Sequence, residues 1–147
     1  ENCFVKTCLY DGISEAVDLL RNRGVRLAVF SNKIDELTQR IVDVLIGSAK
    51  FEIVLGSKSS IPIKPDPTGA LLISKQLGIS PVNMGYIGDT KTDMITANSA
   101  GMYAIGVLWG FRTKKELIEN GAKKLLSHPR ELLEMEEWSD ALPVSRK

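Results

Sequence analysis

Four short polar segments of the chain carry the residue types that phosphoryl-transfer chemistry requires. They are Ser31-Asn32-Lys33, Lys64-Pro65, Gly88-Asp89-Thr90 and Asp93. The first and third each follow an apolar run typical of a buried strand, and the carboxyl ends of parallel strands are where α/β sheets build their sites. Together the four segments predict a site that holds a phosphoryl group at one edge of a sheet.

Asp89 and Asp93 are candidate magnesium ligands. Asp89 directly follows a strand and Asp93 lies near the first turn of the next helix, so both carboxylates can face the same end of the sheet. Mg2+ prefers oxygen ligands and retains several waters, so one direct and one water-bridged carboxylate would suit it. The alternative is that both residues only cap the helix and complement its dipole.

Ser31, Asn32 and Lys64 are candidate phosphoryl ligands. A hydroxyl, an amide and free backbone N–H groups at the start of a helix favour an anion, although Ser and Asn are also common helix caps. Lys64 lies in the proline-rich segment 61–65. A proline-stiffened loop can hold its ammonium group in a fixed place beside a phosphoryl group. The alternative is an ordinary solvated lysine.

The apolar pattern alternates between strands and helices. Apolar, β-favouring runs predict strands at 25–30, 51–55, 84–88 and 103–107, with a short edge strand at 125–126. Helical spacing predicts helices near 13–20, 34–45, 67–77, 94–100, 113–120 and 129–138. Asp66 is expected to cap the third helix, with Pro67 as its first residue. This alternation predicts an α/β fold, a doubly wound parallel sheet with helices on both faces.

Composition and charge exclude several classes of protein. The chain has 147 residues and a formal net charge of +1, so its electrostatics favour neither nucleic acid nor an anionic membrane as a partner. Cys3 and Cys8 are expected to be reduced thiols, and with His128 as the single histidine a zinc site is not expected. The chain has no apolar run near the ~20 residues of a membrane span and no signal-peptide pattern, which predicts a cytoplasmic protein.

The polar segments resemble the motifs of the haloacid dehalogenase-like (HAD) superfamily of aspartate-nucleophile phosphatases. Residues 29–33 resemble its second motif, 64–67 its third, and 88–93 its fourth. Residues 9–13 resemble the junction where the chain leaves a helical cap and re-enters the core. The phosphoglycolate phosphatase-like branch is the closest resemblance, because Gly110-Phe111-Arg112 is similar to its segment after the last main strand.

The resemblance implies a role for each candidate residue. Ser31 and Asn32 would bind the transferring phosphoryl group, and Lys64 would neutralise its charge. Asp89 would ligate Mg2+, with Asp93 acting directly or through water. The resemblance also implies a small phosphorylated metabolite as substrate and an aspartyl-phosphate intermediate.

The family's first motif supplies an aspartate nucleophile and, two residues later, an aspartate acid/base, and a cap inserted after it selects the substrate. None of the eight aspartates in this chain are spaced i, i+2, so neither that motif nor the cap is expected here. The chain is therefore expected to be the C-terminal part of a longer protein. Residues 1–10 would be a remnant of the cap–core junction, 11–138 the core domain and 139–147 a polar tail.

The missing motif also has a structural consequence. In the family it sits on the central strand, so a gap is expected between the strand that ends at Phe30 and the strand that ends at Ile87. An upstream segment, a rearrangement or another chain would have to fill this gap.

The sequence is compatible with three functions. The first is a Mg2+-dependent phosphate-monoester hydrolase, inactive as this chain alone. The second is a non-catalytic binding or assembly module built on a degenerate core, and the third is a phosphomutase of the same superfamily. An Asp-x-Asp-x-Thr segment upstream would favour the hydrolase over the non-catalytic module. The cap would distinguish the phosphomutase from the hydrolase.

Overall fold

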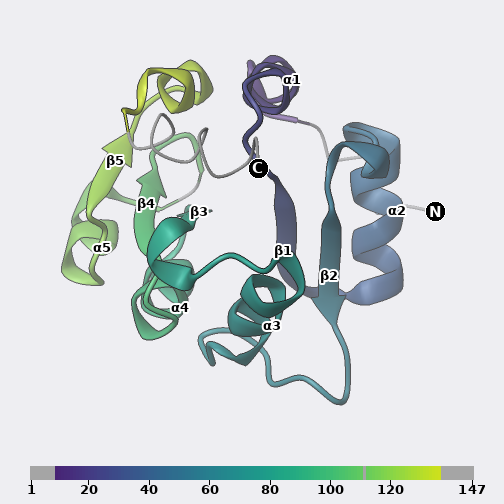
Figure 1. The fold of residues 1–147 in the computed structure, drawn as a ribbon. Coiled ribbons are helices and arrows are strands. Elements are labelled where there is room, and N and C mark those ends of the chain that lie inside the picture. The colour runs from purple at the N-terminus through teal and green to yellow at the C-terminus, as the bar shows by residue number, and fades with distance from the viewer. Residues whose placement is uncertain (1–8, 111, 137–147) are drawn as a thin grey trace. The chain divides into compact units, whose positions relative to one another are not determined.

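The chain folds into strands that alternate with helices, as the apolar pattern predicts (Figure 1). The computed structural model describes residues 9–110 and 112–136. The strands are β1 (Ala28–Ile34), β2 (Ile53–Ser57), β3 (Gly85–Gly88), β4 (Tyr103–Val107) and β5 (Lys124–Leu126). The α-helices are α1 (Ile13–Asn22), α2 (Asp35–Leu45), α3 (Thr68–Leu77), α4 (Lys91–Ser99) and α5 (Lys114–Glu119). Short 3-10 helices are η1 (Ser48–Lys50), η2 (Pro81–Asn83) and η3 (Pro129–Glu134).

The described strands form two separate sheets. One is β1-β2, and the other is β3-β4-β5, in which β3 and β5 both pair with β4 in parallel. Within the described residues β1 and β3 share no ladder and belong to separate sheets, as expected when the first motif is missing. As a result β3 is an edge strand, and its Ile87 is 41% exposed, whereas Ile105 opposite it in the doubly paired β4 is fully buried.

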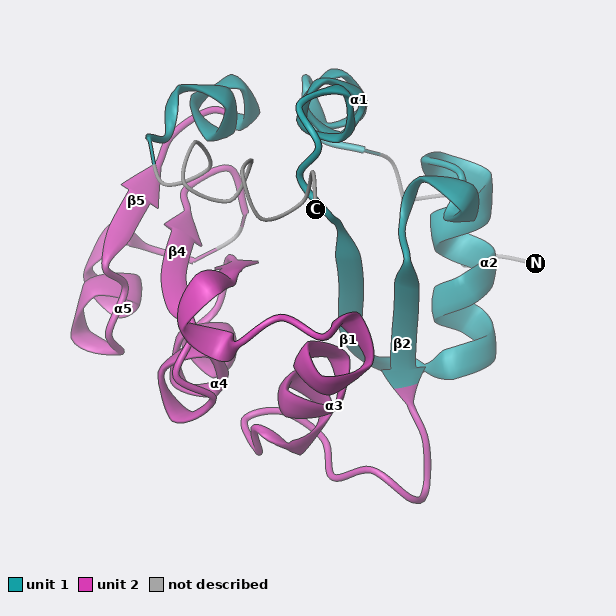
Figure 2. Cartoon of the chain, in the orientation of Figure 1, with its two compact units in different colours: residues 1–56, 129–147 teal, residues 57–128 magenta. Residues whose placement is uncertain are grey.

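The chain divides into two compact units (Figure 2). Unit 1 comprises residues 1–56 and 129–147, and unit 2 comprises residues 57–128. In unit 1, α2 packs against β1, and α1 packs against η3. The Arg23 guanidinium, just after α1, donates a hydrogen bond to the carbonyl of Leu133 in η3 at 2.5 Å. This contact ties the end of the described chain to its beginning.

The core of unit 2 joins the β3-β4-β5 sheet to helices α4 and α5. Met94 and Ala97 of α4, Ala104 of β4 and Leu117 of α5 form a fully buried cluster, and Tyr86 of β3 packs against it. Burying apolar side chains from both helices and the sheet holds α4 against β3. The core thereby positions the junction between β3 and α4, where Asp89 and Asp93 lie.

Strands β1 and β2 begin later than the apolar pattern predicts. The Val25 amide bonds to the Leu20 carbonyl and closes the C-terminal turn of α1, and the Phe51 amide closes a turn with the Ser48 carbonyl. Because an amide that closes a turn is not available to a ladder, the predicted strand starts at 25 and 51 are wrong. Strand β4, in contrast, has the predicted bounds of 103–107.

The helices differ from the prediction at their ends, and α4 begins at Lys91, three residues before its predicted start. Helix α3 begins at Thr68, one residue later than predicted, although the Asp66 carboxylate still accepts a hydrogen bond from the Thr68 amide at 2.8 Å. The last helix is the 3-10 helix η3, whose buried residues are Pro129 and Leu132. A spacing of three puts them on one face of a helix with three residues per turn. It ends at Glu134, so the predicted helix is wrong at 135–136, and its predicted continuation from residue 137 lies outside the described residues.

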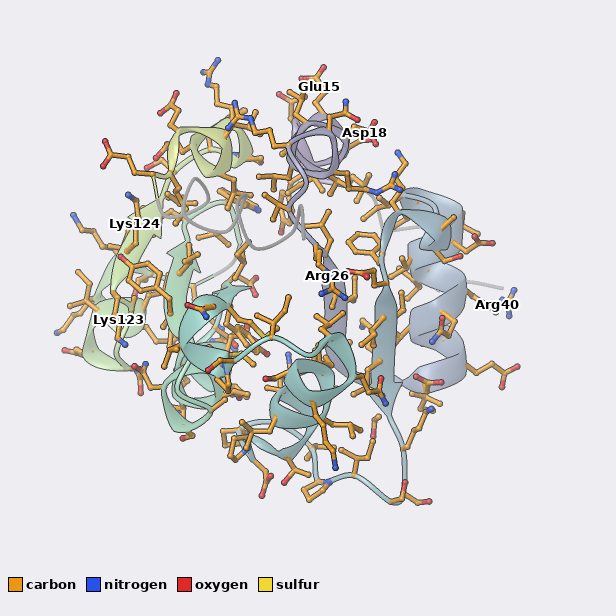
Figure 3. All side chains as sticks on the ribbon, in the orientation of Figure 1. Glu15, Asp18, Arg26, Arg40, Lys123 and Lys124 are labelled. Atoms are coloured by element: carbon orange, nitrogen blue, oxygen red, sulfur yellow. The ribbon has the colours of Figure 1, made fainter. Side chains whose placement is uncertain are left out.

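Charged side chains of both signs are spread over the described elements. Figure 3 shows Glu15 and Asp18 on α1, Arg40 on α2, and Lys123 and Lys124 at the start of β5. This dispersion agrees with a net charge near zero and with the absence of a basic stripe in the sequence. Among the described helices, none has the length and apolar character that crossing a membrane requires.

Candidate active site

The carboxylate of Asp93 is the centre of a hydrogen-bonded cluster in unit 2. Its Oδ1 accepts a hydrogen bond from Lys64 Nζ at 2.8 Å and another from the Tyr86 hydroxyl at 3.4 Å. Its Oδ2 accepts hydrogen bonds from the Thr90 hydroxyl at 2.8 Å and the Thr90 amide at 3.3 Å. Only 12% of the Lys64 side chain and 10% of the Asp93 side chain are exposed, so this ion pair is largely shielded from solvent.

The same carboxylate caps helix α4. The Thr90 hydroxyl accepts a hydrogen bond from the Asp93 amide, and the Asp93 side chain accepts one from the Thr90 amide, which together form a capping box. The T-x-x-D spacing in the sequence is a signal that could have identified Thr90. Gly88 makes room for this arrangement, because a Cβ there would lie 2.2 Å from the Asp93 Cβ. Asp93 therefore both caps α4 and pairs with Lys64.

Tyr86 is a partner that the sequence analysis missed. Burial raises the pKa of the Tyr86 hydroxyl far above its usual range, and the negative charge of Asp93 raises it further. The hydroxyl, which is protonated at neutral pH as in any tyrosine, donates to Asp93. Since the ring packs against the core cluster, Tyr86 links the core to the ion pair. A tyrosine in an apolar run predicts only packing, so no sequence signal marked this role.

Asp89 lies just past β3, in surroundings unlike those of Asp93. Among the described residues, none donates a hydrogen bond to its half-buried carboxylate or forms an ion pair with it. Its side chain instead lies against Gly110, where an added Cβ would be 2.2 Å from Asp89 Oδ2. The oxygens of Asp93 are engaged by protein donors, whereas those of Asp89 accept no hydrogen bond from the described residues.

A hard cation such as Mg2+ fits Asp89 better than Asp93. Proteins bind Mg2+ through one or two carboxylates and leave it several waters. Direct ligation by Asp93 would have to displace the Lys64 ammonium or the Thr90 donors. The described part of the chain contains no group of three or more His, Cys, Asp and Glu side chains that could hold a metal ion. A cation held at Asp89 would therefore need further oxygens from water or substrate.

Ser31 and Asn32 belong to unit 1 and lie within β1, not after it. The strand continues to Ile34, and α2 begins at Asp35 with two acidic side chains in its first turn. The expectation that these residues follow the strand and directly precede the helix is therefore wrong, because β1 includes both of them, whereas their role in binding an anion stays a prediction. The Ser31 hydroxyl accepts a hydrogen bond from the Lys33 amide at 3.1 Å. Ser31 and Asn32 remain candidate phosphoryl ligands as side chains near a strand end.

The sequence matches a known protein family over most of its length. The family model of haloacid dehalogenase-like hydrolases matches residues 2–107, a span that includes all five candidate site residues. The chain belongs to this family. A phosphoglycolate phosphatase from Aquifex aeolicus is 35% identical over 111 residues, which are 76% of this chain and 52% of that protein. Relatives of this kind confirm the phosphoglycolate phosphatase-like branch that the motifs indicated.

Solved structures agree with this assignment. A candidate phosphoglycolate phosphatase from Lactobacillus delbrueckii superposes with a TM-score of 0.85 at 38% identity, covering 90% of this chain and 55% of that one. A candidate β-phosphoglucomutase from Thermotoga maritima superposes with a TM-score of 0.76 at 25% identity, covering 85% of this chain and 58% of that one. This member of the HAD-like family spans about half the length of the relatives it matches.

Removing the Asp93 carboxylate is expected to destabilise this HAD-like chain strongly. Asp93→Ala removes the carboxylate that pairs with the shielded Lys64 ammonium, and breaking a buried pair on one side costs about 3–5 kcal/mol. The double variant Lys64→Met/Asp93→Leu should recover part of this loss, because no unpaired charge remains. Urea unfolding followed by circular dichroism measures both free energies of unfolding.

Glu119→Ala is the matched control for this prediction. Its carboxylate is 61% exposed and lies 3.9 Å from Lys115, so its loss should change the free energy of unfolding by no more than about 0.5 kcal/mol. Similar losses for Asp93→Ala and Glu119→Ala would argue against a stabilising buried pair.

Proposed function

We propose that this chain provides the phosphoryl-binding part of a Mg2+-dependent phosphate-monoester hydrolase. Membership of the HAD-like hydrolase family supports the reaction class, and relatives named phosphoglycolate phosphatase support a small phosphorylated metabolite as substrate. The observation that carries the proposal is the shielded Lys64–Asp93 pair. A lysine ammonium held in place by a buried carboxylate is a preorganised positive charge, which is what a phosphoryl group needs beside it.

In this proposal Lys64 stabilises negative charge on the phosphoryl group, and Asp93 positions Lys64. Asp93 fixes where the ammonium sits, so little reorganisation is needed when a phosphoryl group arrives. Its contact with Mg2+ would then pass through water, because its own oxygens accept hydrogen bonds from protein donors.

Asp89, Ser31 and Asn32 complete the proposed site. Asp89 would supply the direct carboxylate ligand of Mg2+, which when bound would neutralise charge on the phosphoryl oxygens. The Ser31 hydroxyl and the Asn32 amide would donate hydrogen bonds to the same group. The attacking aspartate and the acid/base aspartate would come from an Asp-x-Asp segment that this sequence does not contain.

Replacing Lys64 tests the proposal in a protein that joins this chain to such a segment. Lys64→Met is expected to lower kcat for a small phosphate ester by about a hundredfold to a thousandfold, the usual effect of removing one preorganised charge or donor. Lys64→Arg keeps the charge but changes its shape, so an intermediate loss is expected. Steady-state release of inorganic phosphate with Mg2+ is the measurement.

Lys75→Met serves as the control, because Lys75 is an exposed lysine on α3 in the same unit. Its turnover should match that of the unsubstituted protein. If Lys64→Met retained full turnover, Lys64 would not be the phosphoryl ligand.

A phosphomutase is the second candidate function, supported by the likeness to the candidate β-phosphoglucomutase. The two reactions differ in where the phosphoryl group ends. With β-glucose 1-phosphate, a hydrolase releases inorganic phosphate, whereas a mutase produces glucose 6-phosphate and conserves organic phosphate. If the extended protein, in which this chain is joined to an Asp-x-Asp segment, forms neither product, the non-catalytic module is favoured instead.

A further inference from the structure

Gly110, in the turn that follows β4, lies against the side chain of Asp89. A Cβ built on Gly110 would be 2.2 Å from Asp89 Oδ2, 2.5 Å from its Cβ and 2.8 Å from its Cγ. Contacts this short do not occur between real Cβ atoms and their neighbours. Any other residue at this position would therefore push away either the Asp89 side chain or the turn itself.

The parallel pairing of β3 and β4 explains how the two residues meet. Gly88, the last residue of β3, is opposite Gly106 of β4, so the two strands end at the same edge of the sheet. The chain leaves β3 directly into Asp89. It leaves β4 one residue after Gly106 and turns over residues 108–110, which brings Gly110 onto the Asp89 side chain.

Packing is what restrains Asp89. Four hydrogen bonds hold the Asp93 carboxylate in place. Asp89 accepts no hydrogen bond within the described segments, so its orientation depends on the atoms it touches. A group that binds a ligand loses affinity when its supporting contacts let it move.

We propose that Gly110 is a positioning residue for Asp89. The missing side chain of Gly110 leaves a space that sets where the Asp89 carboxylate sits, and the turn after β4 is thereby part of the site. The contact between Gly110 and Asp89 is inferred from the geometry alone. Its consequence for a divalent cation rests on the proposed function, in which Asp89 is the direct Mg2+ ligand.

A double-variant cycle on the 147-residue chain tests the contact independently of function. Gly110→Ala is expected to lower the urea midpoint of unfolding when Asp89 is present. In the Asp89→Gly background the same substitution should leave the midpoint unchanged, because the clashing atoms are gone. If Gly110→Ala alone fails to fold, recovery of folding in the double variant gives the same answer. An equal loss in both backgrounds overturns the proposal, since the effect would then lie in the backbone of the turn.

Paramagnetic broadening by Mn2+, a spectroscopic stand-in for Mg2+, tests the consequence for a cation. In amide NMR spectra of the chain, Mn2+ should broaden the signals around Asp89. Gly110→Ala is expected to weaken this binding by about tenfold or more, the usual effect of disturbing a residue that supports a metal ligand.

Gly106→Ala is the matched control, because its Cβ would come no closer than 3.0 Å to its neighbours, which are the side chains of Leu125, Leu117 and Ala122 and not that of Asp89. It should leave the Mn2+ broadening as it is in the unsubstituted chain. Unchanged broadening in Gly110→Ala overturns the positioning role. If the unsubstituted chain shows no broadening near Asp89, the metal role in the proposed function fails, and the stability cycle alone decides the contact.

Discussion

The 147-residue chain is expected to show no detectable hydrolysis of a small phosphate ester in the presence of Mg2+. Its candidate residues position and stabilise a phosphoryl group, but its sequence holds no Asp-x-Asp pair to attack that group and protonate the leaving oxygen. Positioning and electrostatics are large terms in phosphoryl transfer, yet covalent catalysis still needs its nucleophile. Removal of a nucleophile can cost on the order of 10⁶ in kcat, which puts the chain below the limit of a phosphate-release assay.

Joining the chain to an upstream segment with an Asp-x-Asp-x-Thr strand is expected to restore turnover. The added strand should also cover the free edge of β3, where Ile87 is 41% exposed. The Met84 carbonyl accepts a hydrogen bond from the Tyr103 amide, so by alternation the backbone groups of Tyr86 also face β4, whereas those of Ile87 face the free edge. Amide hydrogen exchange of Ile87 should then slow, because its backbone groups gain ladder partners, and that of Tyr86 should change little.

A segment whose first aspartate is replaced by Ala separates these two effects. It should slow the exchange of the Ile87 amide without restoring turnover. Mg2+-dependent turnover by the 147-residue chain itself, lost on Asp89→Ala, would show that the nucleophile lies within this chain.

Asp89→Ala in the extended protein is expected to abolish Mg2+-dependent turnover. The charge of a bound metal ion is worth several kcal/mol in such a transition state, so a loss of about a thousandfold or more in kcat/KM is expected. Asp93→Ala should leave a measurable remnant, because Asp93 acts through Lys64 and through water. Phosphate release as a function of Mg2+ concentration distinguishes the two variants, since Asp89→Ala should also raise the Mg2+ requirement.

Glu119→Gln provides the comparison for both variants, because it removes an exposed carboxylate of the same unit. Its turnover and Mg2+ requirement should be unchanged. If Asp93→Ala abolished turnover while folded and Asp89→Ala retained it, the roles assigned to the two carboxylates would have to be exchanged.

The order and type of the elements follow from the sequence, because apolar spacing and turn chemistry act over a few residues. Strand β4 has its predicted bounds, and its Ala104 and Ile105 are fully buried, as a continuous apolar run predicts. Helix α5 begins after Thr113, whose hydroxyl accepts a hydrogen bond from the Glu116 amide. The resemblance to a family whose first motif is missing here implied that β1 and β3 would not pair, and within the described residues they belong to separate sheets.

Sequence patterns did not predict where β1 begins and ends. Its start depends on which amides the C-terminal turn of α1 uses, and its extension to Ile34 puts Ser31 and Asn32 inside the strand. A serine and an asparagine before a helical pattern favour a helix cap. That pattern is the same whether the strand ends before these two residues or continues past them. Backbone hydrogen bonds between separate elements decide that difference.

Only the tertiary structure decided how Asp89 and Asp93 differ. In the sequence both are acidic residues at a strand-to-helix junction, and this pattern fits metal ligands and helix caps equally well. Folding brings Lys64, 29 residues away, and the buried Tyr86 hydroxyl to Asp93, while the turn after β4 brings Gly110 to Asp89. The chemistry of a carboxylate depends on the donors and atoms around it, and here those come from segments that are distant in the sequence and meet only in the folded unit.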